Sequence, residues 1–115
     1  MANWFNRFRT RSPQRDLATD RERLGVLDGA FAQTIESAMR ERDGLQRRLS
    51  EIGTDASFLE TEPAAGNDAK LTEAENQMRA TSARLAGLKE QIDQLERLRG
   101  ELASISMAHG SAEPV

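Results

Sequence analysis

The chain has 115 residues, a formal net charge of −3, no cysteine and only five aromatic residues. This length allows one domain at most. Charged residues make up 30% of the chain and aromatic residues 4%, a balance that is too polar for a compact globular core and is typical of long helices packed along one stripe. The absence of cysteine excludes disulfides and thiolate chemistry, and the acidic net charge argues against a general nucleic-acid binder.

The first twelve residues read as a basic, aromatic N-terminal arm. They hold three of the five aromatic residues, and no acid occurs before Asp16. If residues 1–11 are helical, the aromatic side chains share one arc of the helix and arginines flank it. Such a surface suits docking on its own assembly, on a partner protein or on a membrane surface, whereas nucleic acid ranks last. The expected partner or membrane contacts are Trp4, Phe5, Arg7, Phe8, Arg9 and Arg11.

The next segment predicts a helix over about 13–52. Ser12 is placed to cap the helix and Pro13 to occupy its first turn, although the Thr19-x-x-Glu22 pattern offers a later start. Gly53 is placed to end it. The expected seam advances by three or four residues, with a four-residue stutter after Phe31. Its members are Leu24, Leu27, Phe31, Ile35, Ala38, Arg42, Leu45, Leu49 and Ile52.

Residues 53–68 read as an acidic loop. Between Gly53 and Ala69 there are four acids and no base, together with glycine, proline and small residues. Phe58 and Leu59 are the larger apolar residues of this segment, and we expect them to pack on the nearby helix ends.

A second helix is predicted over about 69–108, with Asn67 or Asp68 as its cap and Gly110 at its end. Its heptad is the clearest pattern in the chain, and only Thr81 and Arg99 interrupt the seam. The other seam members are Leu71, Ala74, Met78, Leu85, Leu88, Ile92, Leu95 and Leu102. Residues 111–115 are expected to form a disordered tail.

Two helices and one loop predict an all-α fold, an antiparallel two-helix coiled-coil hairpin over 13–110 preceded by the arm at 1–12. Folding the chain about the middle of the loop places Ala38 opposite Leu85 and Arg42 opposite Thr81. A polar pair of this kind costs stability but fixes the register of the two helices.

Apolar residues exceed the needs of a two-helix seam at the end opposite the loop. The second helix adds Leu98, Ile105 and Met107 outside its seam, and the first helix adds Val26. Since one partner helix cannot cover these residues, we expect a homo-oligomer that forms a helical bundle. The expected oligomer contacts are Leu24, Leu27, Phe31, Leu98, Leu102 and Ile105.

Residues that carry catalytic or metal chemistry are scarce. His109 is the single histidine and reads as a helix C-terminal residue favoured by the helix dipole. The carboxylates alternate with arginine and lysine at helical spacing, as on a solvated helix face. The sequence therefore predicts no catalytic residue, no cofactor site, no metal site and no enzyme.

The resulting functional hypothesis is a non-enzymatic helical interaction protein, which is an adaptor, a scaffold or a small chaperone-like factor. It acts through self-association and a protein partner, in the cytoplasm. One alternative is a peripheral membrane protein held by the amphipathic arm. A second alternative is a nucleic-acid-associated factor, which predicts binding that falls steeply with salt.

Overall fold

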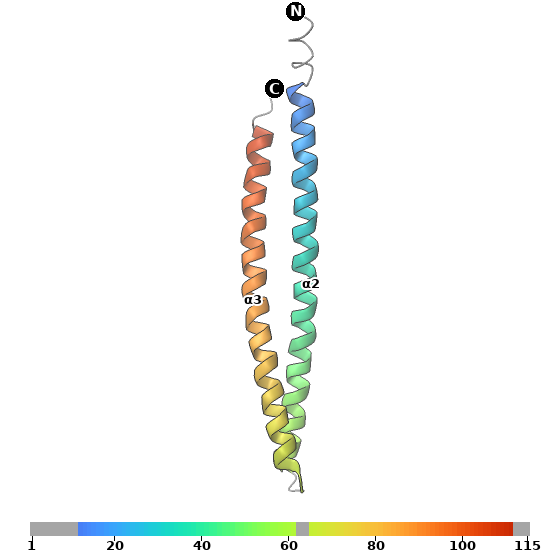
Figure 1. The fold of residues 1–115 in the computed structure, drawn as a ribbon, viewed down its shortest axis with the longest axis vertical. Coiled ribbons are helices and arrows are strands. Elements are labelled where there is room, and N and C mark those ends of the chain that lie inside the picture. The colour runs from blue at the N-terminus through green and yellow to red at the C-terminus, as the bar shows by residue number, and fades with distance from the viewer. Residues whose placement is uncertain (1–11, 62–64, 112–115) are drawn as a thin grey trace, which may run out of the picture. The chain divides into compact units, whose positions relative to one another are not determined.

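Two helices account for most of the chain in the computed structural model, which describes residues 12–61 and 65–111, without the side chains of residues 109–111. Helix α2 spans Pro13–Thr61 and helix α3 spans Asn67–Ser111. They pack against each other as a helical hairpin (Figure 1), and the described ranges contain no strand. The predicted all-α hairpin is confirmed.

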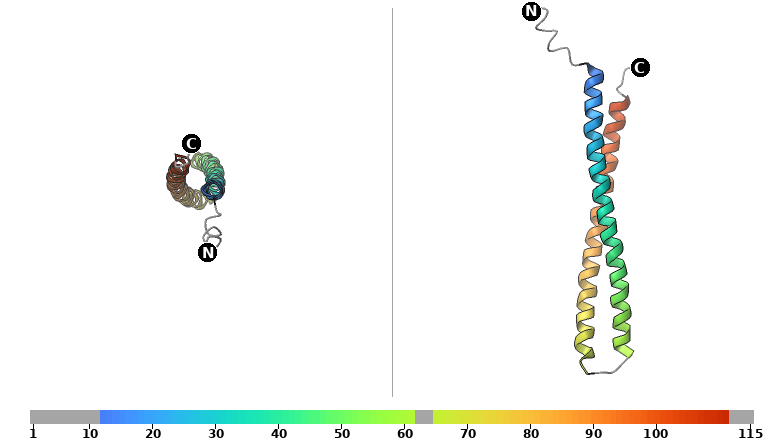
Figure 2. Two further views of the ribbon diagram at one scale, coloured as in Figure 1. Left: turned by 90° about the horizontal axis from the view of Figure 1, so that it is seen from above. Right: turned by 90° about the vertical axis from the view of Figure 1, so that its right-hand side faces the viewer.

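The hairpin divides into two compact units. The unit that we name the open-end unit comprises Met1–Gln33 and Leu95–Val115, and the unit that we name the turn unit comprises Thr34–Gln94. Within each unit, a segment of α2 runs antiparallel to a segment of α3 (Figures 1 and 2). Each unit also has its own ion pair between the helices.

Helix α2 begins where Ser12 and Pro13 predict. The backbone N–H of Arg15 donates to Oγ of Ser12 at 3.1 Å, and the N–H of Asp16 donates to the Ser12 carbonyl at 3.1 Å. The Ser12 side chain therefore satisfies one first-turn donor that has no backbone partner, and its carbonyl accepts the first intrahelical bond, as in an N-cap residue. The alternative start at Thr19 is wrong, since Thr19 lies inside the helix and its hydroxyl donates to the Arg15 carbonyl.

The predicted end of the first helix at Ile52 is wrong, because α2 continues to Thr61. Ala56 is buried and Leu59 is half-buried, so both continue the seam beyond Ile52. Glycine in a helix interior costs about 1 kcal/mol relative to alanine. Burial of the two later seam residues offsets that cost, and Gly53 is accommodated inside the helix.

The predicted acidic loop at 53–68 is correspondingly wrong in extent, since only residues 62–66 separate the two helices. The hydroxyls of Thr54 and Ser57 donate to the carbonyls of Ser50 and Gly53 four residues earlier, as serine and threonine side chains do inside a helix. Phe58 is 65% exposed on α2 and does not pack on a helix end as expected.

Helix α3 starts two residues earlier than predicted and ends later. Gly66 precedes it with a φ of +87°, a conformation that favours glycine, and its carbonyl accepts from the N–H of Lys70 at 3.2 Å. Asp68 lies in the first turn, where the helix dipole favours an acid. The helix continues through Gly110, the expected stop, to Ser111, so residues 112–115 of the predicted tail lie outside the described residues.

The heptad predicted for α3 is confirmed by burial. Between residues 68 and 108, the residues that are not exposed are the ten predicted seam positions and no others. They are Leu71, Ala74, Met78, Thr81, Leu85, Leu88, Ile92, Leu95, Arg99 and Leu102. Both polar interruptions, Thr81 and Arg99, therefore lie on the packed side of the helix.

The seam predicted for α2 needs one correction. Asp28 is half-buried, whereas Leu27 is 49% exposed, so the seam passes through the acid and not through the leucine. With Asp28 included, the seam positions follow an uninterrupted heptad, and no stutter is needed. From residue 24 onward they are Leu24, Asp28, Phe31, Ile35, Ala38, Arg42, Leu45, Leu49, Ile52, Ala56 and Leu59.

The ion pairs between the helices show that the predicted register is displaced. Pairing Ala38 with Leu85 implies that Glu41 lies opposite position 82 and Asp28 opposite position 95. The observed partners are Arg84 and Arg99, two and four positions further along α3. The displacement follows from the shorter connection between the helices, which moves the fold point toward α3.

The buried core is concentrated in the turn unit. Its buried apolar residues are Ile35, Ala38, Ile52, Ala56, Leu85, Leu88 and Ile92, whereas the open-end unit buries Leu102 alone among described apolar residues. Heptad positions in the open-end unit are often polar, as at Arg21, Asp28, Arg99 and Ser106. The open-end unit therefore obtains little stability from apolar burial along its own seam.

Two glycine substitutions should change stability in opposite directions. Gly53→Ala should raise the free energy of unfolding by about 1 kcal/mol, because the site is helical and no atom beyond the local helix backbone lies within 4 Å of the added Cβ. Gly66→Ala should lower it by about 1 kcal/mol, because alanine is disfavoured at positive φ. Urea unfolding followed by circular dichroism measures both. A stabilised Gly66→Ala variant would contradict the geometry of the turn.

Candidate interaction surface

One side of the hairpin is identified by an ion pair in the turn unit. Arg84 donates from Nε and Nη2 to the two carboxylate oxygens of Glu41, at 2.6 and 3.1 Å. Each residue directly precedes a seam residue, namely Leu85 on α3 and Arg42 on α2. Residues at the heptad positions of Glu41 on α2 and Arg84 on α3 can reach each other across the seam. We call the side of the hairpin formed by these positions the flank.

Three of the same heptad positions in the open-end unit are apolar, whereas Asp20, three heptads before Glu41, is acidic. Two heptads before Glu41 lies Leu27 (41 − 14), and two heptads after Arg84 lies Leu98 (84 + 14). One heptad beyond Leu98 is Ile105. These three side chains are 49%, 47% and 48% exposed, respectively. We name Leu27, Leu98 and Ile105 the apolar flank.

The groove beside the flank is polar in the turn unit and partly apolar in the open-end unit. In the turn unit, an open groove of about 440 Å³ is lined only by polar residues and glycine, namely Arg84, Gly87, Glu90, Gln91 and Gln94. In the open-end unit, a groove of about 290 Å³ is lined by Leu24 and Leu27 together with Asp20 and Arg23. The flank thus changes from polar in one unit to apolar with a charged edge in the other.

A second groove continues the acidic edge toward the start of α2. It has a volume of about 300 Å³ and is lined by Asp16, Thr19, Asp20 and Arg23. Asp20 and Arg23 border both grooves and lie 4.0 Å apart at their closest charged atoms. An aromatic ligand that carries arginines would meet apolar side chains and carboxylates next to one another on this surface.

The seam of the open-end unit contains an ion pair that sequence reasoning missed. Arg99 donates from Nε and Nη2 to the two carboxylate oxygens of Asp28, at 2.8 and 3.2 Å. The hydrogen bonds from Arg99 hold the pKa of Asp28 below its ordinary value, and those from Arg84 lower the pKa of Glu41 in the same way. The apolar pattern of α2 alone does not indicate Asp28 as a seam residue, because the arginine that pairs with this acid lies on α3.

These lowered pKa values predict acid sensitivity. A carboxylate whose pKa is lower in the folded state stabilises that state above the unfolded pKa, near pH 4, and the contribution is lost as the pH falls through the folded value. Asp28→Asn should therefore lower the melting temperature at pH 7, and the difference from wild type should shrink as the pH falls below about 4. Melting temperatures across this range test the prediction. A difference that does not change with pH would contradict it.

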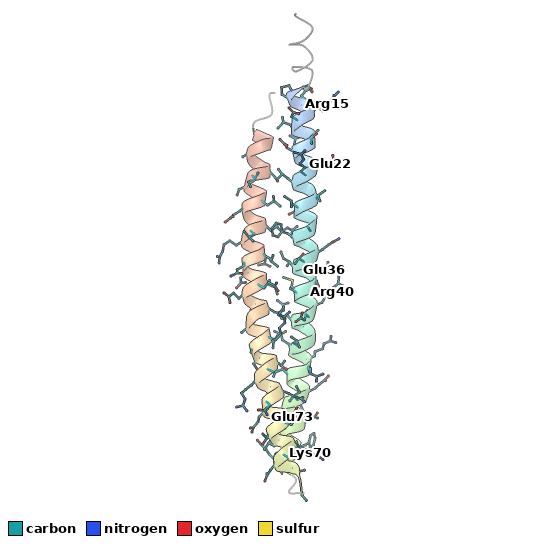
Figure 3. All side chains as sticks on the ribbon, viewed as in Figure 1. Arg15, Glu22, Glu36, Arg40, Lys70 and Glu73 are labelled. Carbon is teal, nitrogen blue, oxygen red and sulfur yellow. The ribbon has the colours of Figure 1, made fainter. Side chains whose placement is uncertain are left out.

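The outer surface of α2 carries ordinary solvated pairs. Glu36 and Arg40, one turn apart, form a salt bridge of 2.6 Å, and both side chains are more than 60% exposed. They project from α2 on the side away from α3 (Figure 3). Exposed pairs within one helix contribute only a few tenths of a kcal/mol, so this surface does not resemble a binding site.

The predicted oligomer contacts separate into three groups. Leu27, Leu98 and Ile105 are exposed, Leu24 and Phe31 are half-buried, and Leu102 is only 7% exposed. Leu102 is thus a core residue of the open-end unit in the single chain, and the oligomer contacts stay a prediction. Trp4, Phe5, Arg7, Phe8, Arg9 and Arg11 lie outside the described residues.

Val26 and Met107 are also exposed, at 68% and 74%, but they do not belong to the apolar flank. Successive helical residues are rotated by about 100°, so Val26 points away from the direction of Leu27. Met107 is nine residues after Leu98, which places it on about the opposite side of α3. These two side chains provide controls of similar character away from the flank.

Comparison of the chain with protein-family models, with curated proteins and with solved structures finds no match. Among the described residues, no group of three or more histidine, cysteine, aspartate or glutamate side chains is placed to hold a metal ion. Within the same ranges, neither helix has an apolar stretch long enough to cross a membrane.

Proposed function

We propose that this protein is a non-enzymatic helical interaction protein, an adaptor or scaffold that self-associates through the apolar flank of its open-end unit. The observation that carries the proposal is the change along the flank, from the ion pair of Glu41 and Arg84 to the exposed leucines Leu27 and Leu98. The cytoplasm is the location that we expect for this role.

The heptad pattern supports the proposal, because the seam residues account for the packing between the two helices and the apolar flank takes no part in it. Every non-exposed residue of α3 between 68 and 108 lies on one stripe, which supports a two-stranded antiparallel coiled coil. Such a coiled coil needs no large aliphatic side chain beside its seam, where charged residues are usual. Three such side chains on one flank therefore favour a further partner.

The weak core of the open-end unit supports the same conclusion. This unit buries one described apolar residue, Leu102, but it holds five of the six large hydrophobic side chains that are exposed in the described ranges. Since apolar burial is the main stabilising term in folding, association would add burial where the single chain has least of it. The turn unit, with seven buried apolar residues, has no comparable need.

The non-enzymatic part of the proposal rests on composition. The chain has no cysteine and one histidine, at position 109, so nucleophile-and-base pairs and zinc sites lack their usual residues. The carboxylates that form ion pairs between the helices are engaged by arginines, which suits a structural role.

Light scattering after size exclusion tests the proposed self-association. We expect a mass above the 12.8 kDa of one chain at high protein concentration, falling toward that value on dilution. A mass that stays at one chain over the whole accessible concentration range would refute the proposal.

A further inference from the structure

The apolar flank alone is too small for a stable interface. Its three side chains are each about half exposed, which falls far short of the ~800 Å² that each partner contributes to a standard protein–protein interface. Flank-to-flank contact between two copies would therefore leave the assembly weak. An additional apolar segment must contribute if association through Leu27 and Leu98 is to be stable.

The N-terminal arm is a segment of suitable chemistry and size. Trp4, Phe5 and Phe8 are three of the five aromatic residues of the chain, and buried aromatic side chains contribute about 150–250 Å² each. Together with the apolar flank, these residues approach the area of a standard interface. The arm thus supplies the apolar surface that the flank lacks.

Charge also matches the arm to this end of the hairpin. Arg7, Arg9 and Arg11 occur in the arm with no acid among them. The grooves beside the apolar flank are lined by two acids, Asp16 and Asp20, and by one base, Arg23. Arginine and carboxylate form strong, oriented hydrogen bonds, so aromatic side chains on Leu24 and Leu27 would bring the arginines near these acids. The polar groove of the turn unit offers no such combination.

The geometry at Ser12 favours the arm of a second copy over the arm of the same chain. Ser12 caps α2 through its hydroxyl and its carbonyl, and Pro13 restricts Ser12 to an extended conformation. An arm that returns to its own flank must reverse direction before Ser12. A tight turn takes four residues, so the reversal would use 8–11. Phe8 would then be part of the turn and could not cover the flank together with Trp4 and Phe5. The arm of another chain has no such restriction.

We propose, building on the self-association proposed above, that residues 1–11 of one copy dock on a second copy. They cover its apolar flank and the adjacent groove lined by Asp16, Thr19, Asp20 and Arg23. Trp4, Phe5 and Phe8 cover Leu24, Leu27 and Leu98, and the arginines of the arm pair with Asp16 and Asp20. The exchange is reciprocal, so a pair of chains closes with two equivalent contacts.

A complementation experiment tests the exchange with two full-length variants. The arm variant, Trp4→Ala/Phe5→Ala/Phe8→Ala, keeps the flank, and the flank variant, Leu27→Glu/Leu98→Arg, keeps the arm. Each variant alone should be monomeric by light scattering, because each lacks one side of both contacts. A 1:1 mixture should form a heterodimer, because one arm and one flank remain to make a single contact.

Other outcomes overturn the exchange in distinguishable ways. If the arm variant assembles like wild type, the arm is not the occupant, although self-association through the flank stands. If the arm variant assembles more strongly than wild type, the arm covers the flank of its own chain. If the flank variant assembles like wild type, the proposed function itself fails. If the mixture stays monomeric while wild type sediments with anionic phosphatidylglycerol vesicles through its arm, the occupant is a membrane surface.

Discussion

Replacing Leu27 by glutamate and Leu98 by arginine is expected to convert the assembled protein into a 12.8 kDa monomer. The two positions stand in the same heptad relation as Glu41 and Arg84, so the substitution extends an existing ion-pair pattern into the open-end unit. Each leucine is about half exposed in the single chain. Covering the exposed parts of both therefore contributes about 1.5–3 kcal/mol in total, and its loss should weaken association by about 10- to 100-fold. Sedimentation velocity measures the change.

The matched control for this variant is Val26→Glu/Met107→Arg. It introduces the same two charges on exposed apolar residues of the same unit, but away from the flank. The control should associate like wild type. Both variants should keep the helical circular dichroism of wild type, because none of the four positions is buried in the single chain. Equal loss of association in both variants would show that added charge, and not the flank, is responsible.

The second large effect is expected at Leu88, which is only 1% exposed and is the most deeply buried side chain of the described core. Leu88→Ala should lower the free energy of unfolding by about 3 kcal/mol, since it removes apolar burial and leaves a cavity. Phe58→Ala, in the same unit but 65% exposed, should change it by less than about 0.5 kcal/mol. Urea unfolding at one protein concentration provides the comparison. Similar losses in the two variants would contradict the assigned core.

The second helix could be predicted almost completely from its sequence. Its seam follows one heptad from Leu71 to Leu102, and only Thr81 and Arg99 interrupt the apolar residues of that heptad. The start of α2 was equally readable, because Ser12 and Pro13 form a specific cap. Local signals suffice where pattern and capping agree.

The end of α2 was missed because Gly53 and the acids after it are typical of a loop. The contrary signal was present in the sequence, since Ala56 and Leu59 continue the heptad of Leu49 and Ile52. The helix continues because Ala56 and Leu59 pack against α3. The sequence of α2 alone does not show how much of these side chains the other helix covers. Tertiary packing thus overrode a local preference.

The position of the apolar flank could be predicted only in part. The excess of apolar residues at the open end is visible in the sequence, but the pattern predicts Leu27 as a seam residue and does not include Asp28. The correct assignment depends on Arg99, which lies 71 residues away and makes an acid acceptable on the packed side. Once Asp28 takes the seam position, Leu27 moves to the flank beside Leu98.

The claim that association buries the apolar flank can be tested at one pair of adjacent positions. The chain has no cysteine, so Leu27→Cys and Val26→Cys each introduce a single thiol that maleimide can label. Both parent side chains are well exposed in one chain. In concentrated, assembled protein, the thiol at position 27 should label slowly and recover its rate on dilution, whereas the thiol at position 26 should label rapidly throughout. Equally rapid labelling of both thiols in assembled protein would contradict the account.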